Sequence, residues 1–461
     1  MSLMVSISGI RGIIGESLTP DVLVKYSAAF AQYCNRGTIV IGRDGRASGK
    51  IIGNLISSTL LAMGCDVVAL GVAPTPTVAL AVEELKATGG IAITASHNPM
   101  QWNGLKFISK TGLFLNADEN EHLWSIADSK QYKYASGDKL GKHSTDESFL
   151  QKHIDLVLKL PYIDVKQIKE KKFKIVVDCI NAAGGTIVPK LLHDLGCEVT
   201  EMNCDVSGIF TRNPEPIPEN LEELCLRVRE AQADLGIAVD PDVDRLVLIT
   251  EKGEPLGEEY TITSVVKFIL GKQKLNPKSE AINHQPSVVV NLSTTRAIDD
   301  VANQYGAKVI RTPVGEINVA EKMKACGAIV GGEGSGGVIL PAVHYCRDAI
   351  VGIALILQQL TEYGGTVSEF KATLSQYSIT KSKVSIIGKN PNRILEKIKQ
   401  KNISNGTIND NDGLKIDFQD SWVHLRKSNT EPIIRIIAEA PQMSRAQALV
   451  EKFKKQISEF V

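Results

Sequence analysis

The chain has 461 residues, of which 43% are hydrophobic and 23% are charged, and this length and composition predict a globular protein of several domains. Lysine plus arginine and aspartate plus glutamate both number 52, so no overall field favours a nucleic-acid partner. The eight cysteines form no C-x-x-C pair, which is typical of reduced thiols in a cytoplasmic protein. Residues 1–11 contain no apolar segment of the kind found in a cleavable signal peptide, and no uncharged apolar run is long enough to cross a bilayer. We therefore predict a cytoplasmic protein without a membrane partner.

A strand–helix–strand unit occurs three times along the chain. The first strands of the three copies are predicted at 38–42, 174–178 and 288–291. In each copy the helix that follows ends at a glycine, Gly64, Gly196 or Gly306, as a left-handed residue after a helix requires. The second copy also has the pair Gly184-Gly185, which we interpret as a loop before its helix. This alternation predicts three related α/β domains with mostly parallel sheets and right-handed crossovers.

Each copy continues through a proline-marked turn and a further helix to a third strand of small and β-branched residues. These third strands are predicted at 90–93, 235–239 and 327–330. The polar loops TASHNP (94–99), DPDVDR (240–245) and GEGSGG (332–337) come next. Because open α/β sheets bind ligands beyond the carboxyl ends of their strands, the three loops should meet if the copies surround one cleft.

The C-terminal part has a different pattern. It predicts a strand at 384–387, a helix at 392–401, a hairpin of 414–418 with 422–425, a strand at 433–438 and a serine-capped helix at 444–460. We expect a separate α+β domain here. Polar stretches at 132–148 and 376–383 suggest boundaries that divide the chain into domains 1–148, 149–250, 251–375 and 376–461.

The loop at 240–245 is a candidate metal site. Asp240, Asp242 and Asp244 place three carboxylates within five residues, between two apolar strands. Oxygen ligands suit the hard cation Mg²⁺, which usually shares its coordination shell with a phosphate. A calcium EF-hand begins with the same spacing, but Arg245 stands where its loop needs glycine. A solvated acidic loop is the alternative, and the flanking apolar strands make it the weaker one.

The loop at 94–99 is a candidate site of covalent chemistry, because Asn98-Pro99 forces Ser96 into a turn at a strand end. A hydrolase is not favoured: there is no G-x-S-x-G motif, and His97, the next residue, is poorly placed to take the Oγ proton. A phosphoserine carries about −1.5 to −2 charges, which Mg²⁺ and arginine would neutralise. We therefore predict that Ser96 carries a phosphoryl group.

Two further loops are candidate ligand sites. The GEGSGG loop fits a dinucleotide fingerprint formally, but an apolar strand follows instead of a helix, which favours Glu333 and Ser335 as ligands of sugar hydroxyls. The cations, hydroxyls and backbone N–H groups of 426–430 are typical of a phosphate site, to which Arg435 is expected to add. A plain tight turn and a charged hairpin turn are the respective alternatives.

Together these motifs resemble those of the α-D-phosphohexomutases, a family of phosphoglucomutases, phosphomannomutases and phosphoglucosamine mutases. The matching motifs are, in order, GIRG (9–12), TASHNP (94–99), NGLK (103–106), DPDVDR (240–245), GEGSG (332–336) and RKSNTEP (426–432). The resemblance implies four domains around a central cleft and interconversion of a hexose 6-phosphate and a hexose 1-phosphate. It also implies a hexose 1,6-bisphosphate intermediate.

The resemblance further implies roles for single residues. A phosphorylated Ser96 would bind Mg²⁺ together with Asp240, Asp242 and Asp244, and Glu333 and Ser335 would hold sugar hydroxyls. The phosphate that does not react would be bound by Arg426, Ser428, Asn429 and Thr430. Proton transfer or charge neutralisation would involve Arg11, His97, Lys106 and Arg245.

Some positions differ from common family patterns. Many bacterial relatives have GEQSGH or GEMSGH where this chain has GEGSGG, and S-G-T where it has Ser428-Asn429-Thr430. Many also have histidine at the position of Glu316, so we expect a second substrate-facing cation to be missing. The combination is most similar to phosphoglucosamine mutases, which favours glucosamine phosphate over glucose or mannose phosphates. A non-catalytic sugar-phosphate-binding protein and a metal-dependent phosphatase are more distant alternatives. A monomer or homodimer is expected.

Overall fold

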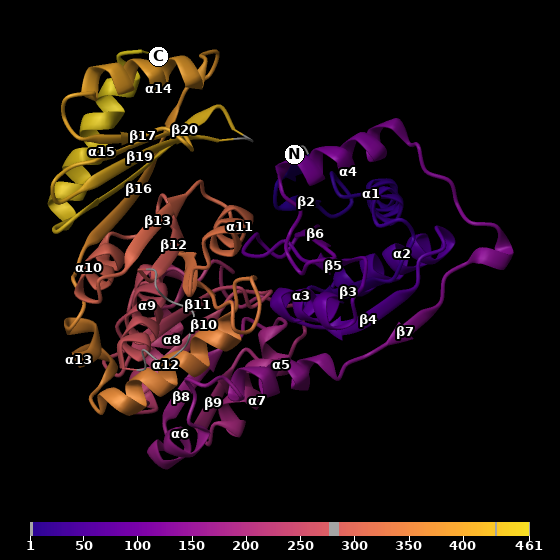
Figure 1. The fold of residues 1–461 in the computed structure, drawn as a ribbon, viewed down its shortest axis with the longest axis horizontal. Coiled ribbons are helices and arrows are strands. Elements are labelled where there is room, and N and C mark those ends of the chain that lie inside the picture. Colours follow the sequence, from indigo (N-terminus) through magenta and orange to yellow (C-terminus); the bar gives the residue numbers. More distant parts are fainter. Residues whose placement is uncertain (1–2, 276–284, 429–430, 461) are drawn as a thin grey trace.

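The computed structural model describes residues 3–275, 285–428 and 431–460, which form four β-sheets with helices packed against them (Figure 1). In Figure 1 the N-terminal sheet lies on the right and the C-terminal sheet at the upper left, and the third and second sheets lie below the C-terminal sheet. The division of the chain into consecutive units, each with its own sheet, confirms the predicted α/β fold class with a C-terminal α+β unit.

The first sheet has seven strands in the order β1-β2-β6-β5-β3-β4-β7. They are β1 Met4–Ser6, β2 Gly9–Ile13, β3 Ile39–Arg43, β4 Val67–Val72, β5 Gly89–Ile93, β6 Trp102–Ser109 and β7 His143–Thr145. Strands β5, β3, β4 and β7 are parallel, whereas β6, β2 and β1 extend the sheet in antiparallel pairs.

Both faces of this sheet are covered by helices, namely α1 Pro20–Tyr33, α2 Gly49–Ala62, α3 Thr75–Glu84 and α4 Ala117–Ser129. Alternate residues of β3 point to opposite faces: Ile39 and Ile41 pack in a core with α1, α2 and α4, whereas Val40 packs with α3. Burial on both faces explains why the parallel strands are apolar almost throughout.

The second and third sheets each have a parallel core and one antiparallel edge strand, in the orders β11-β10-β8-β9 and β13-β12-β14-β15. Their strands are β8 Lys174–Asp178, β9 Glu198–Met202, β10 Leu235–Val239, β11 Leu246–Thr250, β12 Ser287–Asn291, β13 Lys308–Thr312, β14 Val330–Glu333 and β15 Gly337–Ile339. The two sheets share one hydrophobic core. The described helices of this region are α5 Phe149–Leu158, α6 Val165–Lys171, α7 Gly184–Asp194, α8 Glu222–Glu230, α9 Glu258–Leu275, α10 Ala297–Gln304, α11 Glu316–Cys326, α12 Ala349–Tyr363 and α13 Val367–Ala372.

The predicted glycine ends of the three helices are confirmed, with φ of 88° at Gly64, 73° at Gly196 and 66° at Gly306. Two local predictions were wrong. Gly184 and Gly185 begin helix α7 instead of forming a loop. Strand β14 starts only at Val330, because Gly327, with φ of 63°, still caps helix α11.

The fourth sheet is antiparallel, in the order β16-β20-β19-β18-β17. Its elements are β16 Ser378–Ser385, α14 Pro391–Asn402, β17 Thr407–Asn409, β18 Leu414–Asp417, β19 Trp422–Lys427, β20 Ile433–Ala440 and α15 Met443–Ser458. The predicted β18–β19 hairpin is confirmed. Strand β16 begins earlier than expected, inside the polar stretch 376–383, and α15 follows Gln442 without a side-chain cap, so the predicted serine cap is wrong.

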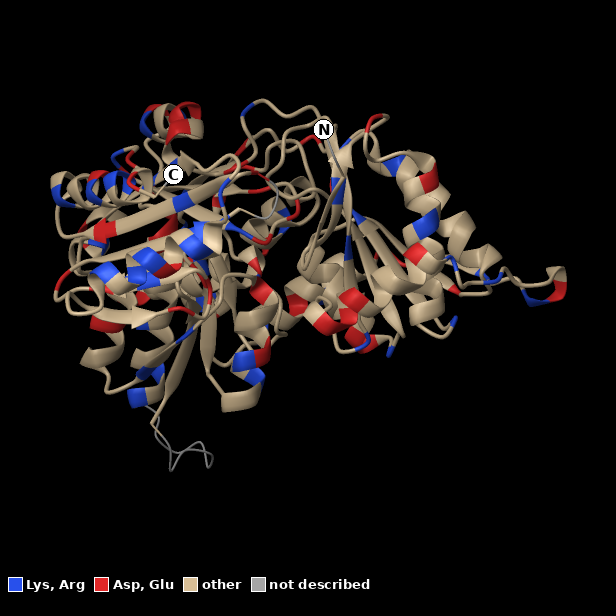
Figure 2. Cartoon of the chain, turned by 90° about the horizontal axis from the view of Figure 1, so that it is seen from above, with Lys and Arg blue, Asp and Glu red and all other residues tan. Residues whose placement is uncertain are grey.

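Lysine and arginine are interspersed with aspartate and glutamate in the view of Figure 2, as the zero net charge suggests. Among the helices that the structure describes, none combines the length and the apolar character that a membrane span requires.

Candidate active site

The loop that carries Ser96 is fixed from below by a buried arginine. Arg46, on the β3–α2 loop, donates through Nη2 to the carbonyl oxygens of Ser96 at 2.6 Å and Asn98 at 2.8 Å. Its Nη1 donates to the carbonyl of Pro99 at 2.8 Å, and its Nε to the carboxylate of Asp44 at 2.9 Å. A rigid guanidinium that donates to three carbonyls of one turn fixes the shape of that turn.

Ser96 itself has a strained backbone, with φ of 48°. Its N–H donates to Thr94 Oγ1 at 2.8 Å, and Thr94 in turn donates to Asp44 at 2.7 Å, so the turn is held in this conformation. Val243, in the loop at 240–245 (the aspartate loop), also has a positive φ, of 62°. Non-glycine residues in this region cost free energy and are concentrated at functional sites.

The serine and the aspartate loop meet, as predicted. Ser96 Oγ lies 3.1 Å from Asp240 Oδ2, at the ends of strands β5 and β10. Helix α3 of the first unit also contacts the aspartate loop, because Thr75 donates from its N–H to the Asp242 carbonyl at 3.0 Å and from its Oγ1 to the Asp242 carboxylate at 2.7 Å. The first and second sheets are therefore connected at the point where their reactive loops touch.

The three aspartates form a compact, buried cluster. One carboxylate oxygen from each of Asp240, Asp242 and Asp244 lies within 4.8 Å of the others. Burial and the charges of Asp244 and Asp242 raise the pKa of Asp240 well above its ordinary value. For Asp244, burial alone would raise the pKa, but the cations Arg347, Lys106 and Arg245 outweigh it, so the pKa lies below its usual range.

This cluster fits a divalent cation. Asp242 Oδ1 and Asp244 Oδ1 are buried and have no hydrogen-bond partner among the residues that the structure describes, and an unsatisfied buried carboxylate oxygen is costly unless a ligand completes it. With Asp240 and the Ser96 hydroxyl, the donor set consists only of oxygens, which suits Mg²⁺. The absence of nitrogen and sulfur ligands from this set argues against metals that prefer such ligands, such as zinc and copper.

A cleft of about 320 Å³ opens beside Ser96 and is lined by all five predicted catalytic residues together with residues of the third and fourth sheets. The predicted site residues along it are Arg11, Ser96, His97, Lys106, Arg245, Glu333 and Arg435. Lys106, on β6, donates to Asp242 at 2.6 Å and to Asp244 at 3.1 Å. Burial would lower the pKa of Lys106, but these carboxylates outweigh it and raise the pKa, so the side chain is charged.

His97 lies closer to the serine than the sequence suggested. Its Nδ1 is 3.3 Å from Ser96 Oγ, so the expectation that His97 is poorly placed was wrong. The left-handed backbone at Ser96 explains this, because it brings two consecutive side chains to the same side of the turn. The charge of Arg245, burial and the charge of Arg11 lower the pKa of His97 well below its ordinary value, so the imidazole is neutral at pH 7.

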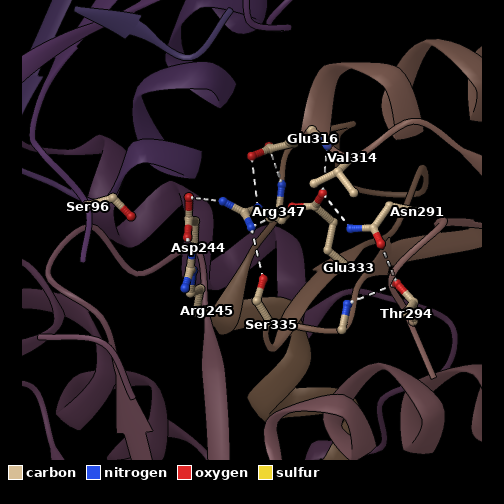
Figure 3. Close-up of polar contacts among 12 residues, drawn as sticks. Ser96, Asp244, Arg245, Asn291, Thr294, Val314, Glu316, Glu333, Ser335 and Arg347 are labelled. Atoms are coloured by element: carbon tan, nitrogen blue, oxygen red, sulfur yellow. Dashed lines mark hydrogen bonds and ion pairs between the residues drawn. The ribbon is translucent and has the colours of Figure 1, made fainter. Parts of the chain in front are cut away.

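The GEGSGG loop at 332–337, called the sugar loop below after its predicted role, connects the strands β14 and β15 of a hairpin and does not begin a helix. This agrees with the interpretation of the sequence. Glu333 accepts through Oε1 from Asn291 Nδ2 at 2.8 Å and from the Gly315 N–H at 3.1 Å. Its Oε2 accepts from Arg347 at 2.8 Å. Ser335 lies 3.4 Å from the same arginine and is not part of the cleft wall (Figure 3).

Arg347 is the main residue that the sequence analysis missed. It lines the cleft beside Glu316, so a guanidinium from another part of the chain lies in the region where we expected a substrate-facing cation to be missing. No motif marks Arg347, because it lies between β15 and α12 and reaches the site only through the folding of the third unit. Arg46 was missed for the same reason.

The predicted phosphate loop is only partly at the cleft. Arg435 lines it, whereas Arg426, its cross-strand partner, lines a different pocket of about 430 Å³ on the fourth sheet and lies 2.9 Å from Asp412. Ser428 follows β19, and its N–H donates to the Ile433 carbonyl. The other two predicted residues of this loop, Asn429 and Thr430, lie outside the described residues.

A buried carboxylate explains one glycine of the GEGSGG loop. A side chain at Gly334 would collide with Oε2 of Glu259, which accepts from the Thr295 N–H at 2.9 Å. Glu259 lies at the start of α9, and burial raises its pKa to about 8. The loop can therefore pass close to this helix only without a side chain at position 334.

This carboxyl group gives the stability of the protein a defined pH dependence. Glu259 keeps its proton up to a pH of about 8 in the folded chain but loses it near 4.5 when unfolded, so its contribution to stability falls as the pH rises between these values. We expect Glu259→Gln to raise the melting temperature by a few degrees at pH 8.5, and this gain to shrink as the pH falls toward 4.5. Thermal denaturation followed by circular dichroism measures it, with the exposed Glu230→Gln as control. Parallel pH profiles for wild type and Glu259→Gln would contradict the assignment.

Comparison with known proteins gives matches along nearly the whole chain. The models for phosphoglucomutase/phosphomannomutase α/β/α domains I, II and III match residues 4–133, 151–253 and 262–377, and the model for the C-terminal domain matches 383–456. A probable phosphoglucosamine mutase of Methanopyrus kandleri is 35% identical over 97% of this chain and 96% of its own. A phosphoglucomutase/phosphomannomutase of Thermococcus kodakarensis is 34% identical over 96% of both chains.

Solved structures show the same fold. A phosphoglucomutase/phosphomannomutase family protein of Burkholderia thailandensis superimposes with a TM-score of 0.84 at 24% identity, over 99% of this chain and 98% of that chain. An N-acetylphosphoglucosamine mutase of Aspergillus fumigatus, solved with GlcNAc-6P and magnesium, superimposes with a TM-score of 0.63 at 15% identity, over 99% and 96% of the two chains.

Proposed function

The chain belongs to the phosphoglucomutase/phosphomannomutase family of isomerases, and we propose that it interconverts glucosamine 6-phosphate and glucosamine 1-phosphate through a phosphoserine at position 96. The observation that carries the proposal is the 3.1 Å contact between Ser96 Oγ and Asp240, inside a cleft that also contains a sugar-loop carboxylate. A strained serine beside three carboxylates is an arrangement suited to reversible phosphoryl transfer.

The proposed reaction has two matched transfers. A sugar hydroxyl oxygen attacks the phosphorus of phosphorylated Ser96, so that a new O–P bond forms and the bond from phosphorus to Ser96 Oγ breaks. The hydroxyl proton is released to a base, and the leaving Ser96 Oγ takes up a proton. This gives a hexose 1,6-bisphosphate. After the bisphosphate turns over in the cleft, Ser96 Oγ gives its proton to a base and attacks the other phosphate, the bond from that phosphorus to the second sugar oxygen breaks, and this oxygen leaves with a proton. The serine is phosphorylated again, and the sugar phosphate has been isomerised.

The residues of the cleft divide this work. Asp240, Asp242, Asp244 and the Ser96 oxygen would hold Mg²⁺, which when bound supplies positive charge against the transferring phosphoryl group. Arg11, Lys106 and Arg245 neutralise phosphate charge, and neutral His97, 3.3 Å from Ser96 Oγ, is positioned to accept the serine proton. Glu333 holds a sugar hydroxyl, and Ser335 would have to turn from Arg347 toward the cleft to hold another. Arg435 with Arg426, Ser428, Asn429 and Thr430 binds the other phosphate. Arg426 would have to leave Asp412 to do so.

The sugar preference rests on the charge of the cleft wall and on the relatives. Glu316 and Glu333 both line the cleft, and carboxylates are suited to the ammonium group of glucosamine. The first relative above is named a probable phosphoglucosamine mutase, whereas the Thermococcus relative is named for glucose and mannose phosphates, so these sugars are the second candidate.

A coupled assay with the three 1-phosphates, each with its bisphosphate activator, separates the two candidates. We expect kcat/KM for glucosamine 1-phosphate to exceed that for glucose 1-phosphate and mannose 1-phosphate by about tenfold or more, because a hydrogen bond between the ammonium group and a charged carboxylate contributes about 1.5 to 3 kcal/mol. A glucosamine value below either of the others would reject the sugar assignment while leaving the family activity intact.

We also propose a cytoplasmic location and the domain division 1–148, 149–250, 251–375 and 376–461. All eight cysteines are free thiols, and the four sheets are formed from four consecutive parts of the chain, which supports both proposals.

A further inference from the structure

The guanidinium of Arg347 donates hydrogen bonds to three carboxylates, which belong to units with different sheets. Its Nη2 donates to Asp244 Oδ2 at 2.7 Å, and its Nη1 donates to Glu333 Oε2 at 2.8 Å. Its Nε donates to Glu316 Oε2 at 2.9 Å, and its backbone N–H donates to Glu316 Oε1 at 2.8 Å. Figure 3 shows the guanidinium between Asp244 of the aspartate loop and the two glutamates of the third unit. One planar group thus joins loops that belong to different sheets.

The last glycine of the GEGSGG loop is matched to this side chain. A side chain at Gly337 would collide with Cδ of Arg347 and approach its Cγ to 3.0 Å. Gly337 does not have a positive φ, so space and not backbone conformation excludes a side chain at this position. The stem of Arg347 therefore fills the volume beside the sugar loop that a larger residue at 337 would need.

The backbone that presents Arg347 is itself fixed by a buried network. The next residue, Asp348, accepts at Oδ2 from His153 at 2.7 Å and from His344 at 2.8 Å. Its Oδ1 accepts from the Ile350 N–H at the start of α12. Each imidazole has a partner at its other nitrogen, Thr77 Oγ1 for His153 and the Cys346 N–H for His344, so the network is complete without a metal ion.

We propose that Arg347 is a positioning residue that sets the distance between the sugar held by Glu333 and the phosphoryl group on Ser96. Because its guanidinium binds Glu333 and Asp244 at the same time, Arg347 fixes the position of the sugar loop relative to the aspartate loop, and thereby relative to Ser96. This inference rests on the proposed function. The alternative is that Arg347 only neutralises the buried carboxylates around it, a task that lysine could also perform.

Arg347→Lys separates the two roles, because an ammonium keeps the charge but cannot bridge two carboxylates in a fixed plane. We expect Arg347→Lys and Arg347→Met to lower kcat/KM about 100-fold or more, mainly through kcat, because a misplacement of reacting groups by about 1 Å can lower the rate about 100-fold. Free guanidinium should restore part of the activity of Arg347→Ala. The exposed Arg227→Met is the matched control and should retain wild-type kinetics.

Gly337→Ala tests the same contact from the other side. The substitution should displace Arg347 and lower kcat/KM in the wild-type background, but have a much smaller effect in the Arg347→Ala background. Equal effects of Gly337→Ala in both backgrounds would mean that position 337 does not act through Arg347.

A readout without substrate distinguishes failure of this inference from failure of the proposed function. Hydrogen exchange of the 331–337 segment should become at least about tenfold faster in Arg347→Lys and Arg347→Met, while Mn²⁺ alone should bind at least as tightly as to the wild type, because a cation beside Asp244 has been moved or removed. Circular dichroism confirms that each variant is folded. A wild type inactive on all three hexose phosphates, with faster loop exchange in the variants, rejects the proposed function and keeps the positioning role. Unchanged loop exchange, or kcat/KM of Arg347→Lys within threefold of wild type, overturns the inference about Arg347.

Discussion

Replacing Ser96 with alanine is expected to lower kcat by about 10⁴-fold or more, because the substitution removes the protein atom proposed to form a covalent bond to the transferred group. The protein should stay folded, since Arg46 binds the backbone carbonyls of this turn and not the serine hydroxyl. Steady-state kinetics with a saturating bisphosphate activator measure the loss. The activator matters because it would rephosphorylate any competent serine.

The exposed serine at the end of α4, in Ser129→Ala, is the control and should have wild-type activity. Ser96→Ala should still bind glucosamine 6-phosphate, because the residues proposed to hold the sugar and its phosphate are unchanged. If Ser96→Ala retained more than a few per cent of wild-type kcat, the covalent role of this serine would be excluded.

The second large effect is expected at the aspartate cluster. Asp242→Asn removes one of three charges that would hold Mg²⁺ and also takes a carboxylate from Lys106, which lies 2.6 Å away. We expect kcat/KM to fall at least about 100-fold and the Mg²⁺ concentration needed for half-maximal activity to rise strongly. Even the loss of an outer-shell partner of a metal lowers metal affinity or activity about 10- to 100-fold. In the wild type, Mg²⁺ should raise the melting temperature, because it relieves repulsion among the buried carboxylates.

The exposed Asp138→Asn, in the loop between α4 and β7, provides the control and should respond to Mg²⁺ as the wild type does. Treatment with EDTA should abolish the activity of the wild type, and added Mg²⁺ should restore it. Full activity in metal-free buffer would show that the aspartates serve another purpose.

The parts of this site that the sequence predicts are those that lie at strand ends. Ser96 follows β5 and Asp240 follows β10, and apolar strands followed by unusual polar loops can be recognised without coordinates. That the two loops touch also follows from the repeat, because equivalent ends of equivalent units face a common centre. Strand β14 was placed too early because small residues such as Gly327 occur both in strands and at helix ends.

Residues that act from a distance along the chain could not be predicted in this way. Arg46 and Arg347 come from loops with no motif, and their importance depends on which carbonyls and carboxylates folding brings within reach. The position of His97 was misjudged because sequence adjacency does not reveal a left-handed φ at Ser96. The glycines of the GEGSGG loop can be seen in the sequence, but the reason for Gly334 and Gly337 cannot, since it lies in the side chains of Glu259 and Arg347.

The claim on which the account depends is that Ser96 stores a phosphoryl group and exchanges it with a sugar phosphate. Mass spectrometry of the intact protein, with peptide mapping, before and after one turnover with isotopically labelled hexose 1,6-bisphosphate tests it most directly. We expect one phosphoryl group per chain, located on Ser96, that carries the label after the turnover. A chain that never acquires the label on Ser96, or that isomerises the sugar while Ser96 remains unmodified throughout, would contradict the account.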